Sequence, residues 1–282
     1  MRRNIVPQCY SSCVPAITSR QNPIVARFRD AAKGASSDVL LLDGVHLVAE
    51  ALGAGLHIRE SAVINVRNVR PDVADLAARL RGREVPVATV SASVMEALSP
   101  VRSPSPVVAL AERPAGAGER VYRDTPMVIV AIDIQDPGNV GAIVRVAEAG
   151  GASGVVCAGA CADPFGWKAL RGSMGSALRL PILVHRDIRT ATDDARRHGC
   201  RIVAASPRGG HPLFASDFRG PVAILIGGEG PGLAPSEVDA ADERVTIPMQ
   251  PPVESLNTAV SAALVVYEAR RQRTPRTLNP EP

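Results

Sequence analysis

The sequence predicts an α/β protein of two domains, each built from helices packed on a sheet. At 282 residues the chain is about twice as long as a typical single domain. Hydrophobic residues make up 46% of it, enough to bury a core in each domain, and aromatic residues only 3%, so Ala, Val, Leu and Ile must build those cores. Short apolar runs alternate with stretches of helical period, as expected of strands covered by helices.

Residues 15–112 are predicted to form a small α/β domain. Its first helix is expected over 22–32, with Val25 and Phe28 facing inward, and a buried strand follows at 39–44. The remaining elements are expected in this order: a helix at 45–54, a strand at 61–66, a helix at 71–81 capped by Gly82, a strand at 85–90, a helix at 91–98 and a strand at 107–111.

The stretch ERPAGAGER at 112–120 is rich in Pro, Gly and charge and has no apolar period, which indicates an interdomain linker over 113–124. The second domain is expected to span 125–273. Its short apolar runs, separated by helical stretches, predict a parallel sheet with covering helices; they are 127–133, 153–159, 180–185, 200–206, 222–227 and 244–249. Residues 1–14 are interpreted as a basic arm and 274–282 as a disordered tail.

The positive charge is concentrated at the beginning of the chain. Residues 1–37 carry six basic side chains and one acidic side chain, whereas the rest of the chain is nearly neutral. The formal net charge is +4, so this first segment accounts for all of the excess. A basic arm followed by a helix is able to meet a polyanion.

No stretch approaches the roughly 20 consecutive apolar residues of a membrane span, and the first residues lack the apolar core of a secretory signal. We therefore expect a cytoplasmic protein without a membrane partner. The five cysteines are Cys9, Cys13, Cys157, Cys161 and Cys200. They are expected to be reduced thiols, because the two close pairs lack both the spacing and the nearby histidines of a zinc knuckle. No metal site is predicted.

Three loops that follow strands of the second domain are candidates for the functional site, since ligands of open α/β sheets bind beyond the carboxyl ends of the strands. The first loop leads into a helix within 133–151, for which Asn139 is a candidate cap. Arg145 is predicted to project opposite the apolar stripe of that helix. From this helix alone, a solvated arginine and a functional one both stay open.

The second loop, GGEGPGL at 227–233, lacks the Lys-Ser/Thr of a P-loop and the glycine spacing of a dinucleotide fingerprint, which disfavours an ordinary nucleotide-dependent enzyme. Its glycines let a ligand lie against bare backbone, with Glu229 as the charged group. The third loop, within 247–273, is stiffened by prolines and leads into a long helix that Ser255 or Asn257 can cap. The side chains expected to face inward from that helix are Val260, Ala263, Leu264 and Tyr267.

Taken in order, the segments DPGNVGAIVR, IGGEGPGL, and IPM followed by ESLNTAVSAAL resemble the three motifs of the SpoU/TrmH family of RNA ribose 2′-O-methyltransferases, part of the SPOUT superfamily. SMGSALRLPI, between the first two motifs, is also similar to that family. ITSRQNPIVARFRDAA and LLLDGVHLVAEAL resemble the family's accessory RNA-binding domain, which is related to a ribosomal protein fold. The resemblance covers residues 15–273, nearly the whole chain.

This resemblance implies a catalytic domain with a deep trefoil knot and a homodimer whose active sites are shared between subunits. It implies S-adenosyl-L-methionine as the cofactor, held largely by backbone at Gly227, Ile247, Met249 and Leu256. The family's polar site maps onto Asn139, Arg145, Glu229, Ser255 and Asn257. One departure is Gln250-Pro251-Pro252, which stands where the family usually has a glycine soon after IPM.

The implied reaction is methyl transfer to a ribose 2′-hydroxyl in structured RNA, either rRNA or tRNA. That hydroxyl is a weak nucleophile and needs deprotonation or stabilisation of its developing alkoxide. A guanidinium is a poor base, so Arg145, donated by the partner subunit, is expected to orient the hydroxyl and stabilise the oxyanion. The alternative is a non-catalytic RNA-binding protein that keeps the fold; the retained polar positions favour the enzyme.

Overall fold

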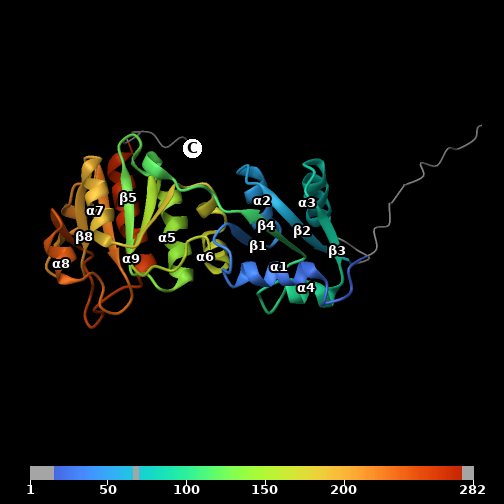
Figure 1. Cartoon of the computed structure of the whole chain (residues 1–282). Helices are drawn as coiled ribbons and strands as arrows, with labels where there is room; N and C mark the ends of the chain where they lie inside the picture. The colour runs from blue at the N-terminus through green and yellow to red at the C-terminus, as the bar shows by residue number, and fades with distance from the viewer. Residues whose placement is uncertain (1–15, 66–69, 275–282) are drawn as a thin grey trace, which may run out of the picture.

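The computed structural model describes residues 16–65 and 70–274 (Figure 1). These residues form two sheets, each with its own helices: a mixed sheet in the N-terminal half and a parallel sheet in the C-terminal half. The predicted arm at 1–14 and residues 275–282 of the predicted tail lie outside the described residues. No helix among the described residues is long and apolar enough to cross a membrane.

The N-terminal sheet has the strand order β1-β4-β2-β3. Strand β4 pairs antiparallel with β1 and β2, and β2 pairs parallel with β3. The strands are β1 (Val39–Asp43), β2 (Ile58–Ile64), β3 (Val87–Val90) and β4 (Val107–Glu112), and the helices are α1 (Pro23–Ala32), α2 (Val45–Gly53), α3 (Pro71–Gly82) and α4 (Ala92–Leu98). Apolar side chains of α1 and α4 pack on one face of this sheet and those of α2 and α3 on the other.

The helices and strands predicted for this half are all present, with ends shifted by a few residues. The side chain of Asn22 caps α1, and Val25 and Phe28 are buried as predicted. The prediction that Gly82 caps α3 is wrong. Gly82 is the last residue of the helix and Arg83 is its C-cap, because the chain continues in helical conformation for one residue more than the apolar period requires.

The C-terminal sheet is parallel throughout, in the order β7-β6-β5-β10-β8-β11-β9. Its strands are β5 (Met127–Ile132), β6 (Gly154–Ala158), β7 (Ile182–His185), β8 (Arg201–Ala205), β9 (His211–Pro212), β10 (Val222–Gly227) and β11 (Glu243–Thr246). The six predicted strands are present, and the two-residue β9 was missed. Because these strands run in one direction, the loops after β5, β8, β10 and β11 meet at one edge.

Helices cover both faces of the parallel sheet (Figure 1). They are α5 (Pro137–Gly150), α6 (Trp167–Ser173), α7 (Ile188–Arg197), α8 (Pro235–Asp239) and α9 (Thr258–Arg273). Helices α5 and α9 pack against each other and share one apolar cluster with the sheet. The opposite face is covered by α7 and by a 3₁₀ helix, η1 (Gly118–Tyr122), whose Val121 and Tyr122 are buried. Part of the segment predicted as linker is therefore packed against the second sheet.

The strand order places β10 between β5 and β8, so the chain returns to the middle of the sheet before its last strand, β11, and α9. This arrangement agrees with the expected fold class. The trefoil knot itself stays a prediction, because strand order does not define how the last segment is threaded.

Three of the five cysteines lie among the described residues, and Cys157, Cys161 and Cys200 are free thiols, as predicted. Cys9 and Cys13 lie outside the described residues. Ile134 N, in the loop after β5, donates a hydrogen bond to Cys161 Sγ at 3.3 Å. The hydrogen bond between Cys157 and Cys161 lowers the pKa of Cys161, and the same bond and burial raise the pKa of Cys157. Cys161 thus helps to anchor the loop that begins the first motif.

Candidate active site

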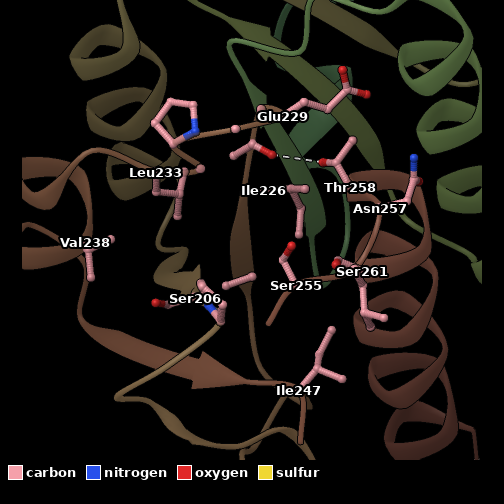
Figure 2. Close-up of a pocket in the computed structure, with 18 of the residues that line it drawn as sticks. Ser206, Ile226, Glu229, Leu233, Val238, Ile247, Ser255, Asn257, Thr258 and Ser261 are labelled. Carbon is pink, nitrogen blue, oxygen red and sulfur yellow. Dashed lines mark hydrogen bonds between the residues drawn. The ribbon is translucent and has the colours of Figure 1, made fainter. Parts of the chain in front are cut away.

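A cavity of about 500 Å³ lies at the carboxyl edge of the parallel sheet (Figure 2). This volume is typical of a small-molecule site. The segments after β8, β10 and β11 form its walls, together with the first residues of α9. All four residues expected to hold the cofactor line it, namely Gly227, Ile247, Met249 and Leu256. The second and third predicted loops, which are distant in sequence, therefore line one cavity.

The glycine loop after β10 is folded so tightly that side chains would collide with its neighbours. A Cβ on Gly227 would lie 2.4 Å from Leu233 N, and one on Gly228 would lie 2.3 Å from Asp133 O. Gly228 also forms an isolated bridge with Gly232, which has a φ of +69°. Glycine alone meets both requirements, and the loop presents bare backbone to the cavity.

Three of the predicted polar residues form one hydrogen-bonded chain beside this loop. Asn139 Nδ2 donates to Glu229 Oε1, and Asn257 Nδ2 donates to Asn139 Oδ1 at 3.1 Å. These hydrogen bonds join α5, the glycine loop and the start of α9. Asn257 and Glu229 also line the cavity, so the polar chain borders it directly.

The prediction that Asn139 caps α5 is wrong. Asp136 is the N-cap, and its Oδ1 accepts a hydrogen bond from Asn139 N at 2.9 Å. The helix begins at Pro137, before Asn139 rather than after it, so the Asp136 carboxylate serves a free amide of the first turn. The amide side chain of Asn139 does not cap the helix and instead links Glu229 and Asn257.

At the start of α9 the structure decides between the two proposed caps. Asn257 Oδ1 accepts hydrogen bonds from Ala259 N at 2.9 Å and Val260 N at 3.2 Å. Ser255 lies before the cap and lines the cavity. The next residue, Thr258, donates its hydroxyl to Gly227 O at 2.9 Å, which ties the helix start to the glycine loop (Figure 2).

The loop between β11 and α9 contains the Gln250-Pro251-Pro252 departure from the family pattern. Val253 N donates to Gln250 O at 3.1 Å, which closes a turn across the two prolines. This turn leaves Met249 on one side and Ser255 and Leu256 on the other, and all three line the cavity. The departure therefore coexists with a complete cavity wall.

Arg145 lies farther along α5 than Asn139 and does not line the cavity of its own chain. It is exposed, whereas Val140, Ile143 and Val144 on the same helix are buried, so the predicted direction of its side chain is confirmed. Arg145 takes part in none of the ion pairs found among residues 16–65 and 70–274. Its guanidinium is free to meet a partner from outside the chain.

The predicted inward face of α9 is wrong. Val260, Leu264 and Tyr267 are 48%, 39% and 51% exposed, and Ala263 is half-buried. The side chains that α9 buries are instead Thr258, Ala259, Ala262, Val265, Val266, Glu268 and Ala269. Close packing explains the rotation: a Cβ on Gly150 of α5 would lie 2.0 Å from Val266 Cγ1. The expected stripe exists but faces outward; Val260, Leu264 and Tyr267 are called the outer stripe below.

Part of the cavity wall was missed from the sequence. Ala205 ends β8, Ser206 and Pro207 follow it, and Val238 and Ser261 also line the cavity. The apolar run at 200–206 gave the strand and its direction, and hence the edge at which it ends. The loop that follows, SPRGGH at 206–211, carries one arginine and a glycine pair, which are the signal that could have marked it as a binding surface.

Comparison with known proteins identifies two sequence families along the chain. The profile described as the SpoU rRNA Methylase family matches residues 126–267. The profile described as Thiostrepton-resistance methylase, N terminus, matches residues 14–123. The two matches fall on the parallel-sheet domain and on the N-terminal domain, respectively.

Individual relatives match over most of their length. The chain is 33% identical over 270 residues to an uncharacterized tRNA/rRNA methyltransferase of Synechocystis. The aligned region covers 93% of this chain and 96% of that protein. It is 27% identical over 234 residues to the 23S rRNA (guanosine(2553)-2′-O)-methyltransferase RlmP of Bacillus subtilis, covering 83% and 89% of the two chains. A solved structure of an AdoMet-bound rRNA methyltransferase from Sinorhizobium meliloti gives a TM-score of 0.80 at 28% identity, covering 91% and 97%.

Proposed function

The chain belongs to the SpoU rRNA methylase family, and we propose how its residues carry out that family's reaction. It is an enzyme that transfers a methyl group from S-adenosyl-L-methionine to a ribose 2′-hydroxyl of RNA. The observation that carries the residue assignments is the cavity bordered by the hydrogen-bonded series Glu229–Asn139–Asn257, in which Asn139 is the middle residue.

The cavity fits S-adenosyl-L-methionine in size and in character. Its lining is apolar where a flat adenine ring can pack, at Ile226, Leu233 and Ile247. Gly227 and its neighbours offer backbone groups at close range, because no Cβ stands in front of them. We assign cofactor binding to Gly227, Ile247, Met249 and Leu256. When bound there, the cofactor supplies an electrophilic methyl group on its sulfonium.

The residues of this chain act on the ribose hydroxyl. Arg145 is assigned to orient that hydroxyl and to stabilise the negative charge that develops on its oxygen, which is the role of a fixed cation rather than of a base. Asn139 and Asn257 hold Glu229 and the starts of α5 and α9 in one arrangement. Ser255 presents its hydroxyl at the cavity wall. Glu229, Asn139 and Asn257 need no rearrangement before reaction, because the hydrogen bonds that join them are already made.

Two features of the surface support a homodimer. The outer stripe places three large apolar side chains side by side on α9, as expected of a helix face that a second copy covers. Arg145 lies on α5, which packs against α9, and outside the cavity of its own chain. In a dimer formed over the outer stripe, we propose that Arg145 of each subunit reaches the cavity of the other and completes both sites.

The N-terminal domain is assigned to RNA binding. The charge excess of residues 1–37 continues into α1, where Arg29 is exposed, and Lys33 at the helix end is exposed as well. Exposed cations of this kind bind phosphates without reading sequence. We propose rRNA as the substrate, because the RlmP relative is named for 23S rRNA, and we expect the enzyme to act in the cytoplasm. Transfer RNA is the alternative substrate.

The test is methyl transfer from labelled S-adenosyl-L-methionine to purified rRNA and tRNA, followed by mapping of 2′-O-methyl positions in cells with and without the protein. Label in rRNA and one missing methyl in the deletion strain support the proposal. Label in tRNA corrects the substrate alone. RNA binding without methyl transfer to either RNA supports the alternative, a non-catalytic RNA-binding protein with the same fold.

A further inference from the structure

The N-terminal domain docks on one segment of the catalytic domain, residues 163–179, which contains α6 (Figure 1). Helix α6 contacts β1 of the N-terminal sheet, and Trp167 packs against the apolar cluster between that sheet, α1 and α4. At the other end of the segment, His46 Nε2 lies 3.3 Å from Met174 O. The segment therefore touches the N-terminal domain along its length.

Arg179 joins the two domains through a single guanidinium. Its Nε and Nη2 donate to both carboxylate oxygens of Glu148 on α5, each at 2.8 Å. Its Nη1 pairs with Glu50 on α2 of the N-terminal domain. The planar fork of arginine fixes direction as well as distance in such a pair. Arg179 thus connects the N-terminal domain to the helix that carries Asn139 and Arg145.

Arg113 makes a second connection between the domains, at the beginning of segment 163–179. It follows β4, and it donates from Nη1 and Nη2 to the two carboxylate oxygens of Asp163 at 2.8 and 2.7 Å. Its guanidinium also lies over the ring of Phe165, 4.7 Å from the centroid. Two bidentate arginines at separated points restrain rotation between the domains more than either does alone.

The docking segment has little freedom to move relative to α5. A Cβ on Gly141 of α5 would lie 2.4 Å from Ala169 O, and a Cβ on Gly172 would lie 3.2 Å from Gly138 O. Gly138 and Gly141 flank Asn139, so α6 is packed against the end of α5 that borders the cavity. Any change in how the N-terminal domain meets α6 is therefore a change relative to the active site.

We propose that Arg179 and Arg113 are positioning residues, which hold the N-terminal domain at one orientation so that RNA bound there presents its ribose to the active site. This inference rests on the proposed function, in which the N-terminal domain binds RNA. Domains joined by a short linker move relative to one another unless their contact prevents it. Once RNA is bound to the N-terminal domain, a fixed domain orientation raises the effective concentration of its ribose at the active site. The orientation therefore acts on RNA binding rather than on the chemical step.

The test separates the cross-domain contacts from the rest of the enzyme. Glu50→Gln removes the negative charge that pairs with Arg179 in the N-terminal domain and leaves the Arg179–Glu148 pair in place. Arg113→Asp and Asp163→Arg are made singly and then together, since the double variant restores opposite charges. Arg189→Gln is the matched control, because Arg189 pairs with Asp193 within α7 and is well exposed.

We expect each of Glu50→Gln, Arg113→Asp and Asp163→Arg to raise the KM for RNA about tenfold. The kcat at saturating RNA and the cofactor Kd are expected to stay within about twofold of wild type, since the cavity is untouched. The double variant recovers most of the loss in KM, and Arg189→Gln behaves as wild type. Small-angle X-ray scattering of the single variants should show a broader range of domain orientations.

Melting temperatures near that of wild type establish that the variants are folded. If a charge-reversal variant is not folded, the inference is tested with Glu50→Gln, which is an isosteric change. Wild-type KM in Glu50→Gln and the single Arg113 or Asp163 variants overturns the inference, as does a double variant no better than its parents. If the wild-type protein methylates no RNA, the proposed function fails instead, while scattering still reports whether the two arginines fix the domains.

Discussion

Asn257 donates a hydrogen bond to Asn139 across 118 positions of sequence, with 3.1 Å between Nδ2 and Oδ1. The same Asn257 side chain caps α9 through its oxygen, so one amide serves two purposes. Its acceptor end stabilises a helix, and its donor end joins the third motif to the first. The two purposes can be separated by substitution, because each uses a different atom.

Asn257→Asp keeps the capping oxygen and removes the donor to Asn139. Since Asp is as good an N-cap as Asn, we expect the free energy of unfolding to change little. Activity should fall at least tenfold, because a carboxylate then faces Asn139 Oδ1 and adds charge beside Glu229. Asn257→Ala loses the cap as well and should be less stable by about 1 kcal/mol. Urea unfolding and methyl transfer measure the two effects; an Asp variant with full activity would show that the link between motifs is dispensable.

Gly227→Ala tests the close approach within the glycine loop. The added methyl would lie 2.4 Å from Leu233 N, so the loop must shift and the cavity wall with it. We expect the Kd for S-adenosyl-L-methionine, measured by calorimetry, to rise at least tenfold. Gly220→Ala is the matched control, since a Cβ there meets no atom within 4 Å. Equal cofactor affinity in the two variants would remove Gly227 from the binding site.

The sequence was enough to predict every strand except the two-residue β9, because parallel strands buried on both faces appear as apolar runs between helical stretches. It also predicted the direction of Arg145, a charged residue on a helix whose other face is apolar. The four residues expected to hold the cofactor follow strands whose ends meet at one edge, so fold class and resemblance together placed them correctly at the cavity.

Details that depend on local competition could not be predicted. Asp136 and Asn139 are both good caps, and the choice between them depends on where the first helical turn begins, which an apolar period does not define. In α9, small and large apolar residues alternate so closely that two faces look alike. The buried face is the one whose side chains fit against α5, and the outer stripe faces solvent. An apolar period indicates a helix and not which face meets its own chain.

The double substitution Arg29→Gln and Lys33→Gln tests RNA binding by the N-terminal domain. Both side chains are exposed at the end of α1, so their removal should leave the fold intact. RNA affinity should fall, and the slope of log affinity against log salt should decrease by about 1.5 as two phosphate contacts are lost. The control removes Arg186 and Arg189 instead, two exposed cations of the catalytic domain. An unchanged slope in the first variant would place the RNA elsewhere.

Leu264→Glu tests the outer stripe. A charge in the middle of an interface is left without water or partner, so we expect the dimer to dissociate and RNA methylation to be lost. Val184→Glu is the control, because Val184 on the edge strand β7 is 54% exposed and lies outside the outer stripe. Sedimentation velocity gives the oligomeric state. A Leu264→Glu protein that sediments as wild type would show that the outer stripe is not the interface.

Arg145→Ala is expected to lower turnover by about a hundredfold, the scale of losing one donor to a developing oxyanion. The Kd for S-adenosyl-L-methionine should stay near wild type, since Arg145 does not line the cavity of its own chain. Calorimetry and single-turnover methyl transfer separate the two quantities. Weaker cofactor binding with unchanged turnover would move Arg145 from the ribose to the cofactor.

Mixed dimers then show to which site Arg145 belongs. An Arg145→Ala subunit retains its cavity, and a Gly227→Trp subunit retains Arg145 but has its cavity filled; each homodimer should be nearly inactive. If Arg145 crosses the interface, a dimer of one subunit of each kind has one site with an intact cavity and an intact arginine, so mixing should restore activity towards one site per mixed dimer. Differently tagged subunits confirm exchange. Confirmed exchange without recovery would place Arg145 in the site of its own subunit, and the methyl-transfer reaction would stand while the shared site would not.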